Sequence, residues 1–188
     1  VEQPNIEMDA FLFDKDKDGI KDSVDLCPNK FGSSNANGCP DNDNDGIPND
    51  YDLCPNLYGA IDLQGCPEIT QFEKNIIYKA LRDLKFDMNK SEIKYSSYPT
   101  LTDITLLLLK NPKMFLHITG HSSSEGSSEY NMGLSAIRAK AVQNFFKERG
   151  IKKSRLILDY LGEGSPLNSN SSEYEKSLNR RVEFKLEY

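Results

Sequence analysis

The stretch YNMGLSAIRAKAVQNFFKERG, residues 130–150, decides the fold of the C-terminal part of the chain. Its apolar side chains recur every three or four residues, which is typical of an α-helix with one buried face. We expect four side chains to point inward: Leu134, Ile137, Ala141 and Phe145. Gly150 is a suitable residue to end this helix.

Apolar segments on both sides of this helix predict strands. KMFLHITG (113–120) is expected to be a buried strand because of its apolar, β-branched content, and RLILDYLG (155–162) is expected to be another strand. A helix between two strands implies a parallel crossover. The final segment, RVEFKLEY (181–188), alternates strictly between apolar and charged residues. We therefore expect a closing strand with one face buried and the other exposed to water.

Two more helices are expected upstream of these strands. In the segment 69–84 one helical stripe is formed by Phe72, Ile76, Ala80 and Leu84, and a short strand is expected at 85–87. The segment 99–112 has Pro99 in its first turn, and one of its faces carries Leu101, Ile104 and Leu108. The prediction is an α+β domain of two layers, with helices packed on one side of a mixed sheet.

Charge divides the chain into two dissimilar parts. Residues 1–68 contain 15 acidic residues and 4 lysines, whereas the remaining 120 residues contain 14 acidic and 19 basic residues. The first part is rich in Asp, Asn, Gly and Pro, so it cannot bury enough apolar surface to offset its ordering entropy. We predict a repeat region over 1–67, with units 14–40 and 41–67, and a globular domain over 68–188.

Three stretches of the globular part resemble the OmpA-like periplasmic domain: FDMNKSEI (86–93), residues 119–142, and residues 162–184. The residues that carry the resemblance are NxxLSxxRA, starting at Asn131, and NRRV, starting at Asn179, at the family's spacing. The resemblance covers about residues 70–188. It implies a βαβαββ two-layer sandwich, no catalysis, and binding of peptidoglycan through the diaminopimelate of its stem peptide.

Carried over by position, the resemblance implies that Arg138 clamps a carboxylate of diaminopimelate in a bidentate fork. Asn89 and Asn131 would hydrogen-bond the ligand, and Arg180 would contribute at the rim of the pocket. Other interpretations are that Arg138 is a solvated helix residue and that Arg180 is a surface charge beside the last strand.

Ser123 departs from the family pattern GHTDxxG, which has an aspartate at this position, fifteen residues before Arg138. The aspartate receives the ligand's ammonium, and a neutral hydrogen bond in its place would weaken binding about tenfold. Glu125 follows two residues later. Either the domain binds peptidoglycan more weakly or differently, or it has lost that function and serves in a calcium-dependent adhesion or protein-interaction module.

The N-terminal part contains a 27-residue repeat, with DxDxDGI followed by an oxygen donor, an aspartate and CP. Alternate side chains in a tight loop converge, glycine permits the turn, and many hard oxygen ligands favour calcium. An acidic, solvated linker is the alternative. The four cysteines predict disulfides in an oxidising compartment; spacing leaves three pairings open. Their separations of 12, 15 and 12 residues are unusual for the alternative, a zinc site.

This repeat resembles the thrombospondin type 3 repeat, which implies calcium binding and disulfides between sequence neighbours, Cys27 with Cys39 and Cys54 with Cys66. The implied ligands of the first unit are Asp14, Asp16, Asp18, Asp22 and Asp25. Those of the second unit are Asp41, Asp43, Asp45, Asn49 and Asp52. Such repeats ahead of an OmpA-like domain are typical of outer-membrane proteins of Bacteroidetes-like bacteria.

Other classes of function find little support in the sequence. Neither a GxSxG nor an HExxH pattern occurs, and His117 and His121 are expected to be structural. The modest basic excess of the second part, without interleaved aromatic residues, argues against nucleic acid. No apolar run reaches membrane-spanning length and no signal peptide is present, so we expect a mature chain or a fragment on the periplasmic side of an outer membrane. An outer-membrane barrel or another domain ahead of Val1 is compatible with the resemblance.

Overall fold

A computed structural model describes residues 13–87 and 89–188 of the chain. It divides between Glu68 and Ile69 into two compact units. The first twelve residues of the predicted repeat region lie outside the described residues. Among the helices of the described ranges, none combines the length and the apolar character needed to cross a membrane.

The first unit consists of loops and two short 3-10 helices, η1 (Ser34–Ala36) and η2 (Ile61–Leu63). Each 3-10 helix lies inside a segment closed by an isolated antiparallel bridge, Ser33 to Cys39 and Ala60 to Cys66. Residues 13–68 contain no α-helix and no extended strand. The lack of regular structure agrees with the low apolar content of this part of the sequence.

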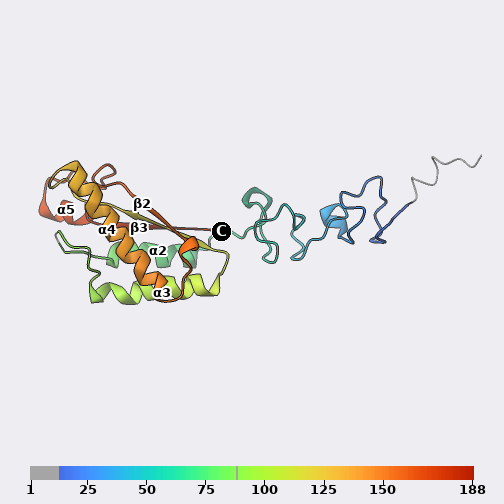
Figure 1. The fold of residues 1–188 in the computed structure, drawn as a ribbon, viewed down its shortest axis with the longest axis horizontal. Helices are drawn as coiled ribbons and strands as arrows, with labels where there is room; N and C mark the ends of the chain where they lie inside the picture. Colours follow the sequence, from blue (N-terminus) through green and yellow to red (C-terminus); the bar gives the residue numbers. More distant parts are fainter. Residues whose placement is uncertain (1–12, 88) are drawn as a thin grey trace, which may run out of the picture. The chain divides into compact units, whose positions relative to one another are not determined.

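The second unit alternates helices with the strands of one small sheet (Figure 1). Its elements are α2 (Gln71–Asp83), η3 (Tyr95–Ser97), α3 (Tyr98–Lys110), β1 (Phe115–Gly120), α4 (Ser128–Lys147), η4 (Lys153–Arg155), β2 (Leu156–Tyr160), α5 (Glu173–Asn179) and β3 (Val182–Glu187). The strand order is β2-β1-β3, with β1 parallel to β2 and antiparallel to β3. The predicted mixed sheet and α+β class are confirmed.

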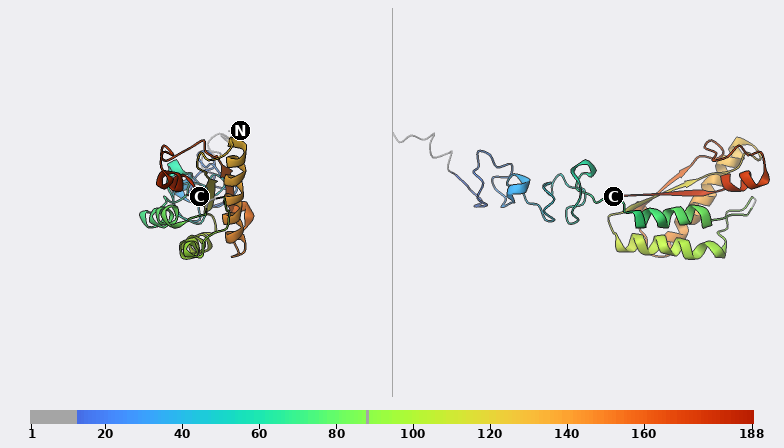
Figure 2. Two further views of the ribbon diagram at one scale, coloured as in Figure 1. Left: turned by 90° about the vertical axis from the view of Figure 1, so that its left-hand side faces the viewer. Right: turned by 180° about the vertical axis from the view of Figure 1, so that it is seen from behind.

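The core lies between one face of this sheet and the helices. That face carries the buried side chains Leu116, Ile118, Val182, Phe184 and Leu186. Helix α4 packs against β1 and β2, α2 packs against β3, and α3 runs beside α2 (Figure 2). The opposite face carries polar side chains such as His117 and Glu187, whose Nε2 and Oε1 atoms lie 2.7 Å apart, as expected for a sheet that is covered on one side.

Three details differ from the sequence prediction. Residues 85–87 are not a strand; Phe86 is buried, and the backbone N–H of Lys85 donates to Ser97 Oγ at 3.3 Å. Phe72 is 71% exposed because the apolar stripe of α2 is buried only near its C-terminal end, at Ala80 and Leu84. β1 is buried on one face only.

The buried face of α4 is only partly the predicted one: Leu134 and Phe145 are buried as expected, but Ile137 is not. Ile137, predicted to point inward, is 50% exposed, while its neighbour Arg138 is 0% exposed. Ser135 also occupies a buried position on this face. Hydrophobic periodicity missed this part of the face because polar side chains occupy positions that apolar residues usually fill.

Helix α5 was not expected from the sequence. Its N-terminus is formed by a capping box, in which the Ser172 side chain accepts from the Glu175 backbone N–H and the Glu175 side chain accepts from Ser172. The S-x-x-E pattern is a sequence signal for such a start. α5 places Lys176 and the following Arg180 close to the loop after β1.

Candidate functional site

The two disulfides of the first unit join sequence neighbours, Cys27 with Cys39 and Cys54 with Cys66. This is the pairing that the resemblance to thrombospondin type 3 repeats implies. Both pairs have a Cα–Cα distance of 5.0 Å, and equivalent backbone hydrogen bonds surround them in the two repeats. The repeats therefore have the same local fold.

Three aspartates converge in each repeat. Carboxylate oxygens of Asp14, Asp16 and Asp18 lie within 4.8 Å of one another, as do those of Asp41, Asp43 and Asp45. Gly19 and Gly46 have φ values of 95° and 91°, which only glycine adopts readily. The sharp turn brings the alternate side chains to one point, as the DxDxDG pattern predicts.

Buried oxygens without partners occur at equivalent positions in the two repeats. Among the described residues, the Oδ2 atoms that lack a hydrogen-bond donor include those of Asp16, Asp25, Asp43 and Asp52. Asp25 and Asp52 are only 8% and 9% exposed. Burial raises the pKa of the Asp52 carboxyl, and the nearby charges of Asp45, Asp43 and Asp41 raise it further. Such unpaired, mutually repelling oxygens fit a hard divalent cation.

The remaining predicted ligands are Asp22 and Asn49, and their side chains hydrogen-bond to the backbone of the aspartate loops. Asp22 Oδ1 accepts from the Lys15 backbone N–H at 2.9 Å, and Asn49 Oδ1 accepts from that of Asn42 at 3.0 Å. Each holds the start of an aspartate loop. The carboxylate clusters comprise the first three aspartates of each repeat and do not include Asp22 or Asn49.

In the second unit, three buried polar residues follow one stripe of α4. Asn131, Ser135 and Arg138 are 1%, 0% and 0% exposed. Their spacing of four and three residues places them on the same helical face. The interpretation of Arg138 as a solvated helix residue is therefore wrong.

The Arg138 guanidinium is held by the backbone of the segment after α2. Nε donates to the Lys90 carbonyl at 3.0 Å and Nη2 to the Asp87 carbonyl at 3.1 Å, with the Phe86 ring centroid 5.2 Å from the guanidinium carbon. Nη1 is buried without a partner among the described residues. Burial, together with the charge of Arg180, lowers the pKa of Arg138 to about 10, so it remains a cation at neutral pH. Its free donors suit an anion.

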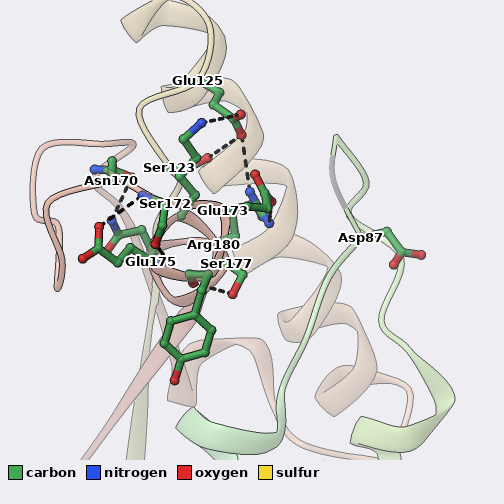
Figure 3. Close-up of polar contacts among 12 residues, drawn as sticks. Asp87, Ser123, Glu125, Asn170, Ser172, Glu173, Glu175, Ser177 and Arg180 are labelled. Atoms are coloured by element: carbon green, nitrogen blue, oxygen red, sulfur yellow. Dashed lines mark hydrogen bonds and ion pairs between the residues drawn. The ribbon is translucent and has the colours of Figure 1, made fainter.

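A charged cluster surrounds Ser123 (Figure 3). Ser123 Oγ donates to Glu125 Oε2 at 3.4 Å. Glu125 also pairs with Lys176 Nζ at 3.1 Å and with Arg180 Nη1 at 3.3 Å. The Lys176 hydrogen bond lowers the pKa of the Glu125 carboxyl, and the charge of Arg180 adds to this. Glu125 is therefore ionised and already has two cationic partners.

Glu163, which neither the periodicity nor the family resemblance predicted, lies against the α4 stripe. Asn131 Nδ2 donates to Glu163 Oε2 at 2.6 Å. The preceding residue is fixed as well, because the Gly162 N–H donates to Ser135 Oγ at 3.1 Å and its carbonyl accepts from the Ser122 N–H at 2.8 Å. The sequence signal is an acidic residue between two glycines, directly after the strand at 155–162.

The NRRV segment supports these loops. Asn179 is fully buried, and its Oδ1 accepts from the backbone N–H groups of Leu167 and Asn168. Its Nδ2 donates to Asn170 Oδ1, which also accepts from the Ser124 N–H. The Arg180 side chain is only 10% exposed, so it is more than a surface charge.

Hydrogen bonds thus connect only some of the residues that were predicted to bind the ligand. Arg138 is joined to the segment 87–90, which contains Asn89, an exposed turn residue with a φ of 55°. Ser123 is linked to Arg180 through Glu125, and Asn131 contacts Glu163. A groove of about 670 Å³ between α2 and α3, lined by Phe72 and other residues, contains none of them.

Comparison with known proteins agrees with this arrangement. The model of the OmpA family matches residues 85–180, which is just over half of the chain and includes Ser123, Arg138 and the first two residues of NRRV, Asn179 and Arg180. The chain belongs to the OmpA family. This match confirms the family that residues 131–139 and 179–182 indicated.

Two relatives of this OmpA-family chain come from Pseudomonas aeruginosa. Outer membrane porin F is 32% identical over 177 residues, which cover 93% of this chain and 41% of the porin. A peptidoglycan-associated lipoprotein is 32% identical over 107 residues, covering 57% of this chain and 63% of the lipoprotein. The chain thus spans less than two thirds of the length of these relatives.

The fold of the OmpA-family unit is also found in a solved structure. The crystal structure of the peptidoglycan-associated lipoprotein from Burkholderia pseudomallei superposes with a TM-score of 0.54 and 24% identity. The superposition covers 55% of this chain and 88% of that one. It supports the α+β arrangement of the second unit.

Proposed function

We propose that the second unit anchors an outer membrane to peptidoglycan without catalysis, by binding the diaminopimelate of the stem peptide. The observation that carries the proposal is the unpaired Nη1 of Arg138, on a side chain that is 0% exposed. A buried cation with free donors is costly unless an anion completes it. A carboxylate of diaminopimelate is such an anion.

The other predicted residues have places in this proposal. Carbonyls use two of the five N–H donors of Arg138, so three remain for an end-on carboxylate. Arg180 adds positive charge nearby, and Asn89 and Asn131 supply amide groups. Ser123 supplies a hydroxyl where the family pattern has an acid. The P. aeruginosa relative, whose name describes it as peptidoglycan-associated, supports the ligand class.

For the first unit we propose a calcium-stiffened spacer with thrombospondin type 3 repeats. Its support is the matched set of unpaired carboxylate oxygens in the two repeats. Calcium would be held by the three clustered aspartates of each repeat together with Asp25 or Asp52. Its charge would offset the repulsion among these carboxylates, in place of a missing apolar core.

Sedimentation with purified sacculi tests the anchoring function. The wild-type protein should sediment and be displaced by free diaminopimelate. Arg138→Lys should reduce binding about tenfold or more, because an ammonium cannot reproduce the guanidinium fork. Arg82→Lys is the matched control, since Arg82 is exposed and pairs with Asp83, which is not a predicted ligand residue.

Two results would contradict this function: a wild-type protein that stays in solution, or an Arg138→Lys variant that folds normally and sediments like wild type. The first result would favour the second candidate, a protein-interaction module that has lost peptidoglycan binding. The second result would mean that sacculi are bound without the Arg138 guanidinium. The neutral residue at position 123 and the existing ion pairs of Glu125 favour that candidate.

A further inference from the structure

A zwitterionic ligand needs a negative partner for its ammonium as well as Arg138 for its carboxylate. Two acids lie near the α4 stripe, Glu125 on the loop after β1 and Glu163 on the loop after β2. Neither was assigned a role by the sequence. Their surroundings differ enough to decide between them.

Glu125 is unsuitable because its charge is already used. Lys176 and Arg180 lie 3.1 and 3.3 Å from its oxygens. An ammonium at this carboxylate would approach both cations, and their repulsion would oppose the attraction of the single negative charge. The charged cluster around Ser123 therefore does not attract a further positive charge.

Glu163 has no such partners. Among the described residues no cation forms an ion pair with it, and Asn131 Nδ2 provides its only hydrogen bond, at 2.6 Å. The residue is half-buried, so a charge on it is screened less than on the open surface. Its negative charge is therefore available to an incoming ammonium.

Position also favours Glu163. The Gly162 contact with Ser135 and the Asn131 contact with Glu163 fix its loop on the stripe that continues to Arg138. Side chains on a helix lean toward its N-terminus, so the Arg138 guanidinium extends from its Cα in the direction of Asn131. The free cation and the free acid are thus presented on one face of α4.

We infer that Glu163 is the ligand-binding acid of this chain and receives the ammonium group adjacent to the carboxylate held by Arg138. It takes the part of the aspartate that Ser123 replaces. The inference rests on the proposed peptidoglycan binding. It identifies the ligand class as an amino-acid terminus with a free ammonium.

A thermodynamic cycle that combines two ligands with two protein variants tests this role of Glu163. Calorimetric titrations would compare meso-diaminopimelate with pimelate, the same chain without amino groups, on wild type and on Glu163→Gln. Wild type should prefer diaminopimelate, and Glu163→Gln should lose about tenfold of that preference while binding pimelate with nearly unchanged affinity. Gln retains an acceptor for Asn131, and melting curves would check the fold.

Matched variants distinguish a specific role of Glu163 from a role of Glu125 and from a general effect of charge. Glu129→Gln removes the same charge from the exposed first turn of α4 and should keep the preference. Loss of the preference in Glu125→Gln but not in Glu163→Gln would overturn the inference and assign the ammonium to Glu125, while peptidoglycan binding would stand. Absence of diaminopimelate binding by wild type would instead overturn the proposed function, and this inference with it.

Discussion

Asp25 Oδ1 accepts a hydrogen bond from the backbone N–H of Cys27 at 2.7 Å, and Asp52 has the equivalent bond with Cys54 at 2.6 Å. The residue before the second cysteine also lies close to the carboxylate, since a Cβ on Gly38, next to Cys39, would lie 1.9 Å from Asp25 Oδ1. The disulfide thus fixes the aspartate whose Oδ2 is left without a donor.

Removal of one disulfide should therefore weaken calcium binding in its own repeat. In Cys54→Ser/Cys66→Ser the second repeat should lose about 2–4 kcal/mol of stability and the position of Asp52. Calcium titration should show fewer or weaker sites than in wild type, measured by calorimetry. The intact first repeat is the internal control, and an unchanged titration would contradict the coupling.

The raised pKa of Asp52 predicts that the metal-free repeats are more stable at acidic than at neutral pH. Its pKa is raised from 3.8 in the folded state, so the folded state holds the proton more tightly than the unfolded state. Protonated Asp52 therefore stabilises the folded state. This stabilisation is complete at pH values below the unfolded pKa of 3.8, and it is lost as the pH rises through the raised pKa of the folded state. Metal-free protein should thus resist proteolysis within residues 14–67 better at pH about 4 than at pH about 7.

Calcium should reverse this pH dependence of stability because protons compete with it for the same carboxylate oxygens.

Asp25→Asn, which keeps the acceptor for Cys27, should stabilise the metal-free repeat and weaken calcium binding about tenfold. Asp62→Asn, at an exposed position in η2, is the control. Proteolysis that responds neither to calcium nor to pH would remove the metal from the proposal.

Ser123→Asp should strengthen diaminopimelate binding about tenfold. A second acid in this cluster would balance the charges of Lys176 and Arg180 and would add a negative charge for the ligand's ammonium to that of Glu163. The new carboxylate would lie next to Glu125, but Lys176 and Arg180 are close enough to offset their repulsion. Ser124→Asp adds the same charge at an exposed neighbouring residue and should have little effect. Equal effects of the two substitutions would indicate general attraction and contradict a specific role of position 123.

The sequence predicted the sheet well because its strands alternate or are strongly apolar. The strand at 181–188 buries Val182, Phe184 and Leu186 as expected. Segment 85–87 was misassigned because Phe86 is buried beside Arg138 without pairing to a strand. Periodicity reports burial, and burial alone does not determine the hydrogen-bond partners of a backbone.

The site was less predictable than the fold. The family resemblance identified Arg138, whereas hydrophobic periodicity placed the buried face at Ile137. Glu163 was missed because its role depends on a contact with Asn131, 32 positions away, and on the absence of a cationic partner. Such features depend on how loops meet in space and leave no periodic signal in the sequence.

Asn179 provides a last test of how the loops of the site are held. It is fully buried, and its amide makes four hydrogen bonds, to the backbone of Leu167 and Asn168 and to Asn170 Oδ1. Asn179→Ala should lower the free energy of unfolding by about 2–3 kcal/mol in urea, because buried polar groups lose their partners. It should also weaken diaminopimelate binding, since Asn170 accepts from the Ser124 N–H.

Asn144→Ala is the matched control, because Asn144 is exposed on α4 and, within the described part of the chain, its side chain hydrogen-bonds only to Lys147. This substitution should change the unfolding free energy by less than about 0.5 kcal/mol. If Asn179→Ala were as stable as Asn144→Ala, the loop 167–170 would be held by other contacts. The first residue of NRRV would then act on the ligand itself rather than through Asn170 and Ser124.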